Sequence, residues 1–226
     1  MNWEFIAQQF PLYQAALGLT LNLAFWGILG ASLLGFFISW IRLMKIPGLT
    51  ALAEFYLELS RNTPLLIQLF FLYFGLPKLG LVLSAEACAI LGLIFLGGSY
   101  MAETFRSGFE ALNPIQKESA LALGLTPWQT FAHVLLPQAL AVALPSFSAN
   151  LIFLIKETSV FSAVALADLM YVAKDLIGIY YETDEALLLL VLSYLVVLLP
   201  ISLIFSWFER RLRHAGFGPT SALSRN

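Results

Sequence analysis

The chain has 226 residues, of which 60% are hydrophobic and only 12% are charged, and its formal net charge is −2. Soluble domains carry about 25% charged residues, so this composition indicates a membrane protein. The slightly negative charge gives no support for nucleic-acid binding, one cysteine excludes an intrachain disulfide, and two distant histidines do not suggest a metal centre.

Five apolar segments predict an all-α integral membrane protein with five transmembrane helices in a single domain, 1–226. A helix needs about 20 apolar residues to cross a bilayer, and the segments are 17–41, 63–83, 87–105, 136–155 and 186–208. Residues 1–16 mix aromatic and polar side chains, which favours a separate interfacial segment. The five-span core is therefore expected at 17–208, followed by a basic tail at 209–226.

The hydrophilic stretch 113–137, between the third and fourth spans, carries a doubled helix-capping pattern. Asn113 and Thr126 are each followed by a proline and, three residues after the cap, by a glutamine that can complete a capping box. Gly124 can adopt the left-handed conformation that ends the first helix, with Leu125 folding back on it. The sequence predicts two short helices joined by a sharp break, which is a rigid surface for a partner.

This stretch also contains a spaced signature that resembles the EAA loop of ABC-importer permease subunits, with Ser119 where the family usually has Ala. Its members are Glu118, Ser119, Ala120, Gly124, Leu136 and Pro137. Further stretches, at 61–68, 100–106, 136–138 and 156–159, resemble the polar amino-acid branch of that family, and the similarity covers roughly 15–212.

The resemblance implies a type I importer permease fold and a set of partners. These are a cytoplasmic ABC ATPase dimer that contacts the signature residues, a second permease chain (identical or related), and an extracytoplasmic amino-acid-binding protein. Membrane lipid surrounds the spans, the amino acid is the substrate, and no nucleic acid is involved. ATP and Mg²⁺ belong to the ATPase, so this chain is expected to need no cofactor and to catalyse no reaction. The expected location is the bacterial cytoplasmic (inner) membrane.

Basic residues predict an N-terminus outside and a C-terminus in the cytoplasm, because positively charged residues collect on the cytoplasmic side. With this orientation three lysines lie outside, Lys78, Lys156 and Lys174. Eight basic residues lie inside: Arg42, Lys45, Arg106, Lys117, Arg210, Arg211, Arg213 and Arg225. Residues 113–137 then face the cytoplasm.

A polar stripe on the fourth span predicts the substrate path. Its members fall at i, i+4, i+7 and i+11, and they are Ser146, Asn150, Phe153 and Glu157. Interrupted helices with polar residues mark substrate sites in transporters, and Pro145 weakens the helix here. Lys156, Thr158 and Ser159 are expected to assist. The family resemblance implies an acid near the position of Asn150 in arginine-type systems, so its absence here favours neutral or acidic polar amino acids. The alternative is that Ser146 and Asn150 only hold helices together.

Two charge pairs spaced three residues apart, Glu58 with Arg61 and Glu103 with Arg106, are expected to be structural. Two other functions stay open. An ion-coupled secondary transporter would need internal repeats and intramembrane carboxylates, and no repeat is evident. A membrane-embedded enzyme would need a nucleophile–base pair or a metal site, which the scarcity of His and Cys disfavours.

Overall fold

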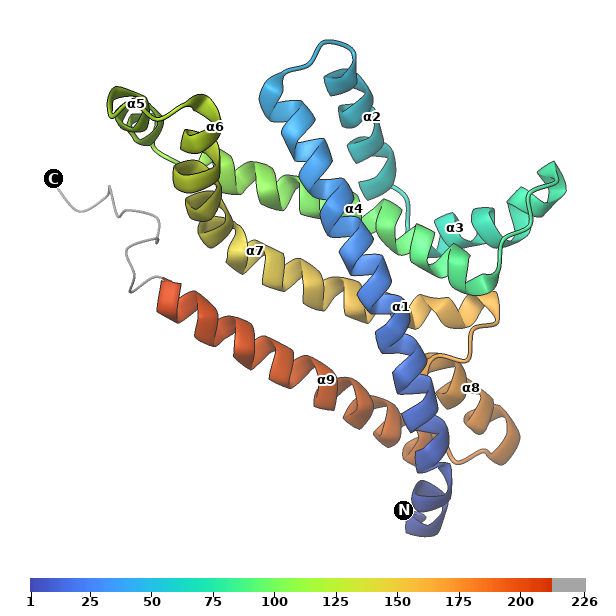
Figure 1. The fold of residues 1–226 in the computed structure, drawn as a ribbon. Helices are drawn as coiled ribbons and strands as arrows, with labels where there is room; N and C mark the ends of the chain where they lie inside the picture. The colour runs from blue at the N-terminus through green and yellow to red at the C-terminus, as the bar shows by residue number, and fades with distance from the viewer. Residues whose placement is uncertain (213–226) are drawn as a thin grey trace, which may run out of the picture.

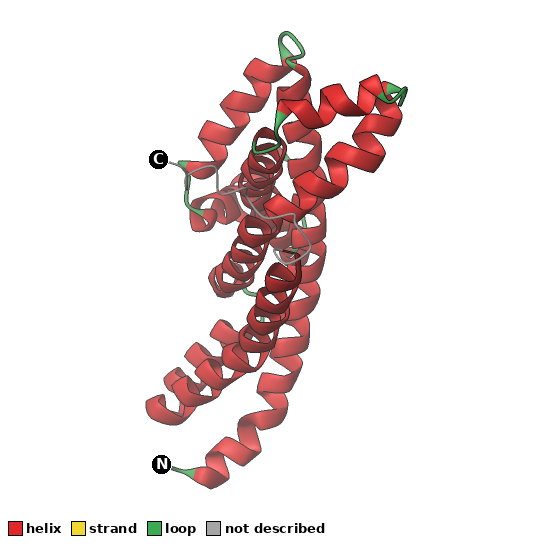
Figure 2. Ribbon diagram, turned by 90° about the vertical axis from the view of Figure 1, so that its left-hand side faces the viewer, coloured by secondary structure: helices red, strands yellow, loops and turns green. Residues whose placement is uncertain are grey.

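The structure is a computed structural model, and it describes residues 1–212. Arg213, Arg225 and the rest of the expected basic tail beyond Leu212 lie outside the described residues. The described chain contains helices and no strand, which confirms the all-α expectation (Figures 1 and 2). The elements are α1 (Trp3–Met44), α2 (Leu49–Arg61), α3 (Leu65–Phe70), η1 (Phe71–Gly75), η2 (Leu76–Leu79), α4 (Ala85–Glu110), α5 (Pro114–Ala122), α6 (Pro127–Gln129), η3 (Thr130–Leu135), α7 (Leu136–Glu157), η4 (Thr158–Val164), α8 (Leu169–Tyr180) and α9 (Thr183–Leu212).

Four helical stretches are long and apolar enough to cross a membrane, and a fifth apolar run is shorter. The four are Trp3–Met44, Ala85–Glu110, Pro127–Val164 and Thr183–Leu212, and the shorter run is Leu65–Leu79. Thr183–Leu212 has the smallest buried share of the four, as expected for the span most exposed to lipid. The five-span expectation therefore depends on how the second span is completed.

The second span is broken, because Pro64 has no N–H and disfavours helical geometry in the residue before it. The run Leu65–Leu79 alone would be about 22 Å long as a helix, short of the roughly 30 Å hydrocarbon core. We expect α2, which the sequence did not predict, to complete the crossing. The Gln68 amide stabilises the break by donating to the carbonyls of Ser60 at 3.2 Å and Thr63 at 3.0 Å.

Residues 1–16 are not the separate segment that we expected, because from Trp3 on they are the first part of the continuous helix α1. Their place in the membrane interface stays a prediction. Packing explains the difference. Tyr13 is buried and donates a hydrogen bond from its hydroxyl to the Ala186 carbonyl at 2.7 Å. The backbone N–H of Asn2 donates to the Glu185 carboxylate at 2.7 Å. These contacts with the start of α9, together with packing on α8, keep the chain helical through Pro11.

The helices α1 and α4 form the most extensive contact in the fold, and Figure 1 shows α1 crossing α4. Small residues at four-residue spacing on α1, Gly27, Ala31 and Gly35, are buried against Leu93, Gly97 and Met101 of α4. Between membrane helices, such small residues allow the close van der Waals approach that replaces the hydrophobic effect.

We predict that Gly35→Ala destabilises the protein. A Cβ at Gly35 would lie 2.5 Å from the Met101 Cβ and 2.7 Å from the Ala102 nitrogen, so the helices would have to separate. Overpacking of this kind costs about 1–3 kcal/mol. The matched control is Gly18→Ala in the same helix, where no atom lies within 4 Å and the free energy of unfolding should hold or rise slightly. Equal thermal unfolding midpoints for the two variants in detergent would contradict the prediction.

Candidate functional site

The hairpin formed by α5 and α6 confirms the local capping pattern in part. The Asn113 side chain caps α5 by accepting from the Ile115 amide at 3.0 Å, but no capping box with Gln116 forms there within the described residues. Thr126 and Gln129 form the complete capping box that the sequence predicts. Gly124 has φ 85°, its N–H donates to Leu121, and the Leu125 N–H donates to the Ala120 carbonyl at 3.2 Å. These two bonds define a Schellman motif, which fixes the angle of the break.

The second helix of this hairpin is not a separate short helix, which corrects the sequence expectation. It runs from α6 through the π-helix η3 into α7, so Leu136 and Pro137 begin the long helix of the span. The Leu136 N–H donates to the Phe131 carbonyl five residues back. Pro137 has no N–H to donate, and the wide turn of η3 just before it allows the helix to continue through this proline without ending.

The tip of the hairpin exposes both charged and apolar side chains. Glu118, Ser119 and Gly124 are exposed, whereas Ala120 is 4% exposed. Large apolar residues surround them, with Leu123 at 81% and Trp128 at 69% exposure. A patch of this kind at the end of the molecule indicates a protein-binding surface.

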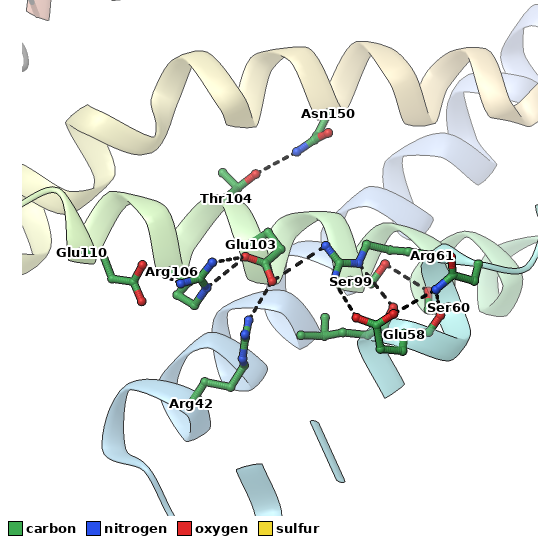
Figure 3. A network of polar contacts seen from close by, with 12 residues as sticks. Arg42, Glu58, Ser60, Arg61, Ser99, Glu103, Thr104, Arg106, Glu110 and Asn150 are labelled. Atoms are coloured by element: carbon green, nitrogen blue, oxygen red, sulfur yellow. Dashed lines mark hydrogen bonds and ion pairs between the residues drawn. The ribbon is translucent and has the colours of Figure 1, made fainter. Parts of the chain in front are cut away.

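The two predicted charge pairs form and join into one network around Glu103 (Figure 3). Glu103 accepts from Arg106 at 2.7 Å and from Arg42 at 2.8 Å, and Arg61 lies 3.9 Å away. Arg106 also pairs with Glu110, and Arg61 with Glu58. The network ties together the ends of α1, α2 and α4. Local spacing predicted the pairs, but nothing local in the sequence links Arg42 to Glu103.

The polar stripe of α7 lies mainly against α4. The Asn150 amide donates to the Thr104 hydroxyl at 2.8 Å (Figure 3), and Ser146 and Thr104 hydroxyls share a hydrogen bond of 3.0 Å. The ring of Phe153 packs on Tyr100, with centroids 5.2 Å apart. These contacts favour the helix-joining alternative. Among the described residues the side-chain oxygen of Asn150 has no hydrogen-bond partner, and it is not one of the fully buried polar atoms.

The remaining predicted path residues differ in accessibility. Lys156 is exposed, and Glu157 is half-buried without a hydrogen bond or ion pair among the described residues. Thr158 is fully buried and donates to the Ile155 carbonyl at 2.7 Å. Ser159 is half-buried, and its carbonyl accepts from Ser162. The substrate role of these residues stays a prediction.

Comparison with known proteins identifies the family. Residues 27–214 match the family described as the binding-protein-dependent transport system inner membrane component. The chain belongs to this family. Similar chains include the probable amino-acid ABC transporter permease protein PatM of Vibrio harveyi (33% identical, covering 95% of this chain and 97% of PatM) and the arginine transport system permease protein ArtQ of Bacillus subtilis (32%, covering 94% and 99%).

Solved structures of related transporters have the same fold as this inner-membrane component. A crystal structure of an amino acid ABC transporter with histidines has a chain with a TM-score of 0.85 and 31% identity, covering 93% of this chain and 99% of that one. A MetNI methionine ABC transporter chain has a TM-score of 0.76 at 20% identity, covering 91% and 98%, which supports the fold alone. The type I importer permease-like fold is thus confirmed, and none of these relatives is a secondary transporter.

One buried polar group was missed by the sequence interpretation. Asp168 caps α8, accepting from the Tyr171 amide at 2.9 Å, but its side chain is fully buried and its second oxygen has no hydrogen-bond partner in residues 1–212. The hydroxyl of Tyr194 in α9 is likewise buried and makes no hydrogen bond within the same residues. Burial raises the pKa of Asp168 to about 6, although backbone amides and Lys174 oppose the shift. No local pattern distinguishes this cap from an exposed one.

We predict that Asp168→Asn removes a pH dependence of stability. The folded-state pKa is raised above the ordinary value of about 3.9, so ionisation is easier in the unfolded chain. Stability should therefore fall as pH rises from about 4 to 6 and stay lower above it, by close to 3 kcal/mol in total. Asparagine can still cap α8 but carries no charge.

Thermal unfolding between pH 4 and 8 measures this dependence. The matched control is Asp184→Asn, which removes an exposed acid from the first turn of α9 and should keep the wild-type slope. An unchanged slope in Asp168→Asn would contradict the predicted shift.

Proposed function

We propose that this inner-membrane component is the permease subunit of an ATP-driven importer of polar amino acids. In this proposal it forms half of a translocation pore with a second permease chain, either identical or related. An extracytoplasmic binding protein delivers the amino acid. The similarity to PatM, a probable amino-acid ABC transporter permease, and to ArtQ, an arginine transport permease, supports the substrate class.

The hairpin of α5 and α6 carries the proposal, because it lies at the end of the molecule opposite the N-terminus (Figure 1) and exposes Glu118 and large apolar residues. We infer that it docks on a cytoplasmic ABC ATPase dimer, which would bind ATP and Mg²⁺ in place of this chain. The orientation is then N-terminus outside and C-terminus cytoplasmic, in agreement with the count of basic residues. ATP-driven closure of the ATPase would move the hairpins and shift the pore between two conformations, coupling the two sites energetically.

For the substrate path we propose the side-chain oxygen of Asn150 and the carboxylate of Glu157, which make no hydrogen bond or ion pair among the described residues. They lie seven residues apart on one side of α7, about 10 Å along the helix. Both groups are hydrogen-bond acceptors, and the negatively charged Glu157 carboxylate suits the ammonium group of an amino acid. The positively charged Lys156 suits the carboxylate of the amino acid. Unmet polar groups are expensive in a low-dielectric pore, which favours such matched contacts.

We predict that Gly124→Asp or Glu118→Lys lowers ATPase binding at least tenfold while the chain still inserts. A side chain at φ 85° strains the break by about 1–2 kcal/mol, and the lysine reverses a charge at the proposed interface. Co-purification of the ATPase measures docking. Asp184→Lys, a charge reversal in the first turn of α9, is the matched control and should bind normally.

Insertion and orientation are checked with a cysteine at Lys117, which should be labelled only from the cytoplasmic side. Wild-type ATPase binding and transport by both hairpin variants would overturn the docking proposal.

We predict that Asn150→Ala lowers transport or changes its selectivity without reducing basal ATPase activity. Because Asn150 also joins α7 to α4, the matched control is Thr104→Val, which removes the same hydrogen bond and leaves Asn150 in place. Uptake of radiolabelled amino acids by proteoliposomes measures both variants. Identical effects of the two substitutions, together with normal uptake by Glu157→Ala, would assign the stripe to helix packing.

A further inference from the structure

The ring of Phe131, at the start of η3, contacts aromatic rings from three other elements. Its centroid lies 4.8 Å from Trp40 of α1, in an edge-to-face arrangement, and 5.8 Å from Phe109 of α4, stacked at 16°. It also lies 5.8 Å from Trp128, which is exposed at the hairpin. Both edge-to-face and stacked geometries are attractive between aromatic rings. We call these four residues the Phe131 cluster.

The Phe131 cluster and the Glu103 network use the same segments of α1 and α4. Trp40 precedes Arg42 by two residues on α1, and Phe109 lies between Arg106 and Glu110 on α4. The same two helix ends are therefore held together by charges through Glu103 and contacted by the hairpin through one ring. A displacement of Phe131 would therefore act on the segments of α1 and α4 whose charged residues pair with Glu103.

No hydrogen bond or ion pair joins residues 113–135 to α1 or α4 within the part of the chain that the structure describes. The second arm continues into α7, which itself packs on α4. Ring packing through Phe131 is the further contact that joins this arm to the ends of both α1 and α4.

The position of Phe131 in the chain supports a role in movement. It lies in a π-helix, and π-turns inside longer helices frequently coincide with functional sites. The neighbouring Thr130 is 2% exposed, and among the described residues its hydroxyl has no hydrogen-bond partner. The wide π-turn beside it is a point at which the arm can change its geometry.

We propose that Phe131 is the positioning residue that passes movement of the hairpin to α1 and α4, through its contacts with Trp40 and Phe109. This inference rests on the proposed docking of an ATPase at the hairpin. Phe131 touches neither the substrate path nor the nucleotide. It acts by keeping the hairpin and the tied helix ends in contact while the complex changes conformation.

The test uses the full permease–ATPase complex in proteoliposomes with the Phe131→Ala variant. The ATPase should co-purify at the wild-type level and basal hydrolysis should stay within twofold. Transport per ATP hydrolysed should fall at least tenfold, because movement of the hairpin still enters α7 along the continuous helix but no longer moves α1 and α4 with it. Phe131→Trp restores a ring and should restore coupling, whereas Phe131→Leu, which keeps only apolar volume, should not.

The matched control is Phe208→Ala, which removes a ring that packs edge-to-face on Trp207 near the end of α9. It should transport normally. A second readout is an environment-sensitive fluorophore on a cysteine at Lys45, next to the end of α1. The native Cys88 is fully buried and should not react. ATP should shift the emission in the wild-type complex and leave it unchanged in Phe131→Ala.

Normal coupled transport by Phe131→Ala, an equal loss in Phe208→Ala, or a persisting ATP-driven emission shift would each overturn the role of Phe131. The docking proposal would survive those outcomes. Failure of the wild-type chain to bind its ATPase would instead overturn the docking proposal and this inference with it.

Discussion

Close backbone contact between α1 and α4 is the constraint on which the rest of the structure depends. Water drives no association inside a bilayer, so the two helices adhere through van der Waals contact that only small residues permit. Gly35 approaches the backbone of Met101 and Ala102, and Gly97 faces Ala31. With α4 fixed in this way, α2 attaches through Tyr56 and Ser60, which both donate to the Phe95 carbonyl.

The charged and aromatic contacts near the ends of α1 and α4 depend on this close packing. Glu103 can accept from Arg42 only because the glycine-mediated packing brings the end of α1 to α4. The hairpin beyond these ends gets its shape from local bonds, those of the Schellman motif at Gly124 and the capping box at Thr126. A rigid hairpin on tied helix ends suits a family whose members work as membrane components of larger transport systems.

Features set by neighbouring residues could be predicted from the sequence, and features set by tertiary packing could not. The left-handed Gly124, the Thr126–Gln129 box and the pairing of Glu103 with Arg106 each need only a few adjacent residues. In contrast, the chain through Pro11 stays helical because α8 and α9 pack on it. The burial of Asp168 likewise depends on distant helices, and the contact of Asn150 with Thr104 depends on how α4 meets α7.

Because Pro127–Val164 is one continuous helical stretch, the number of residues between Gly124 and Leu136 decides the direction in which the hairpin points. Each residue of an α-helix turns the chain by about 100° and advances it by 1.5 Å. One residue inserted or deleted between Gly124 and Leu136 would therefore swing the tip of the hairpin around the axis of the span, even if every side chain were kept. The π-helix η3 already accommodates one wide turn. The spacing between the glycine and the Leu–Pro pair is thus a matter of helical phase, and a change in length there would misdirect Glu118 more severely than most substitutions at the tip itself.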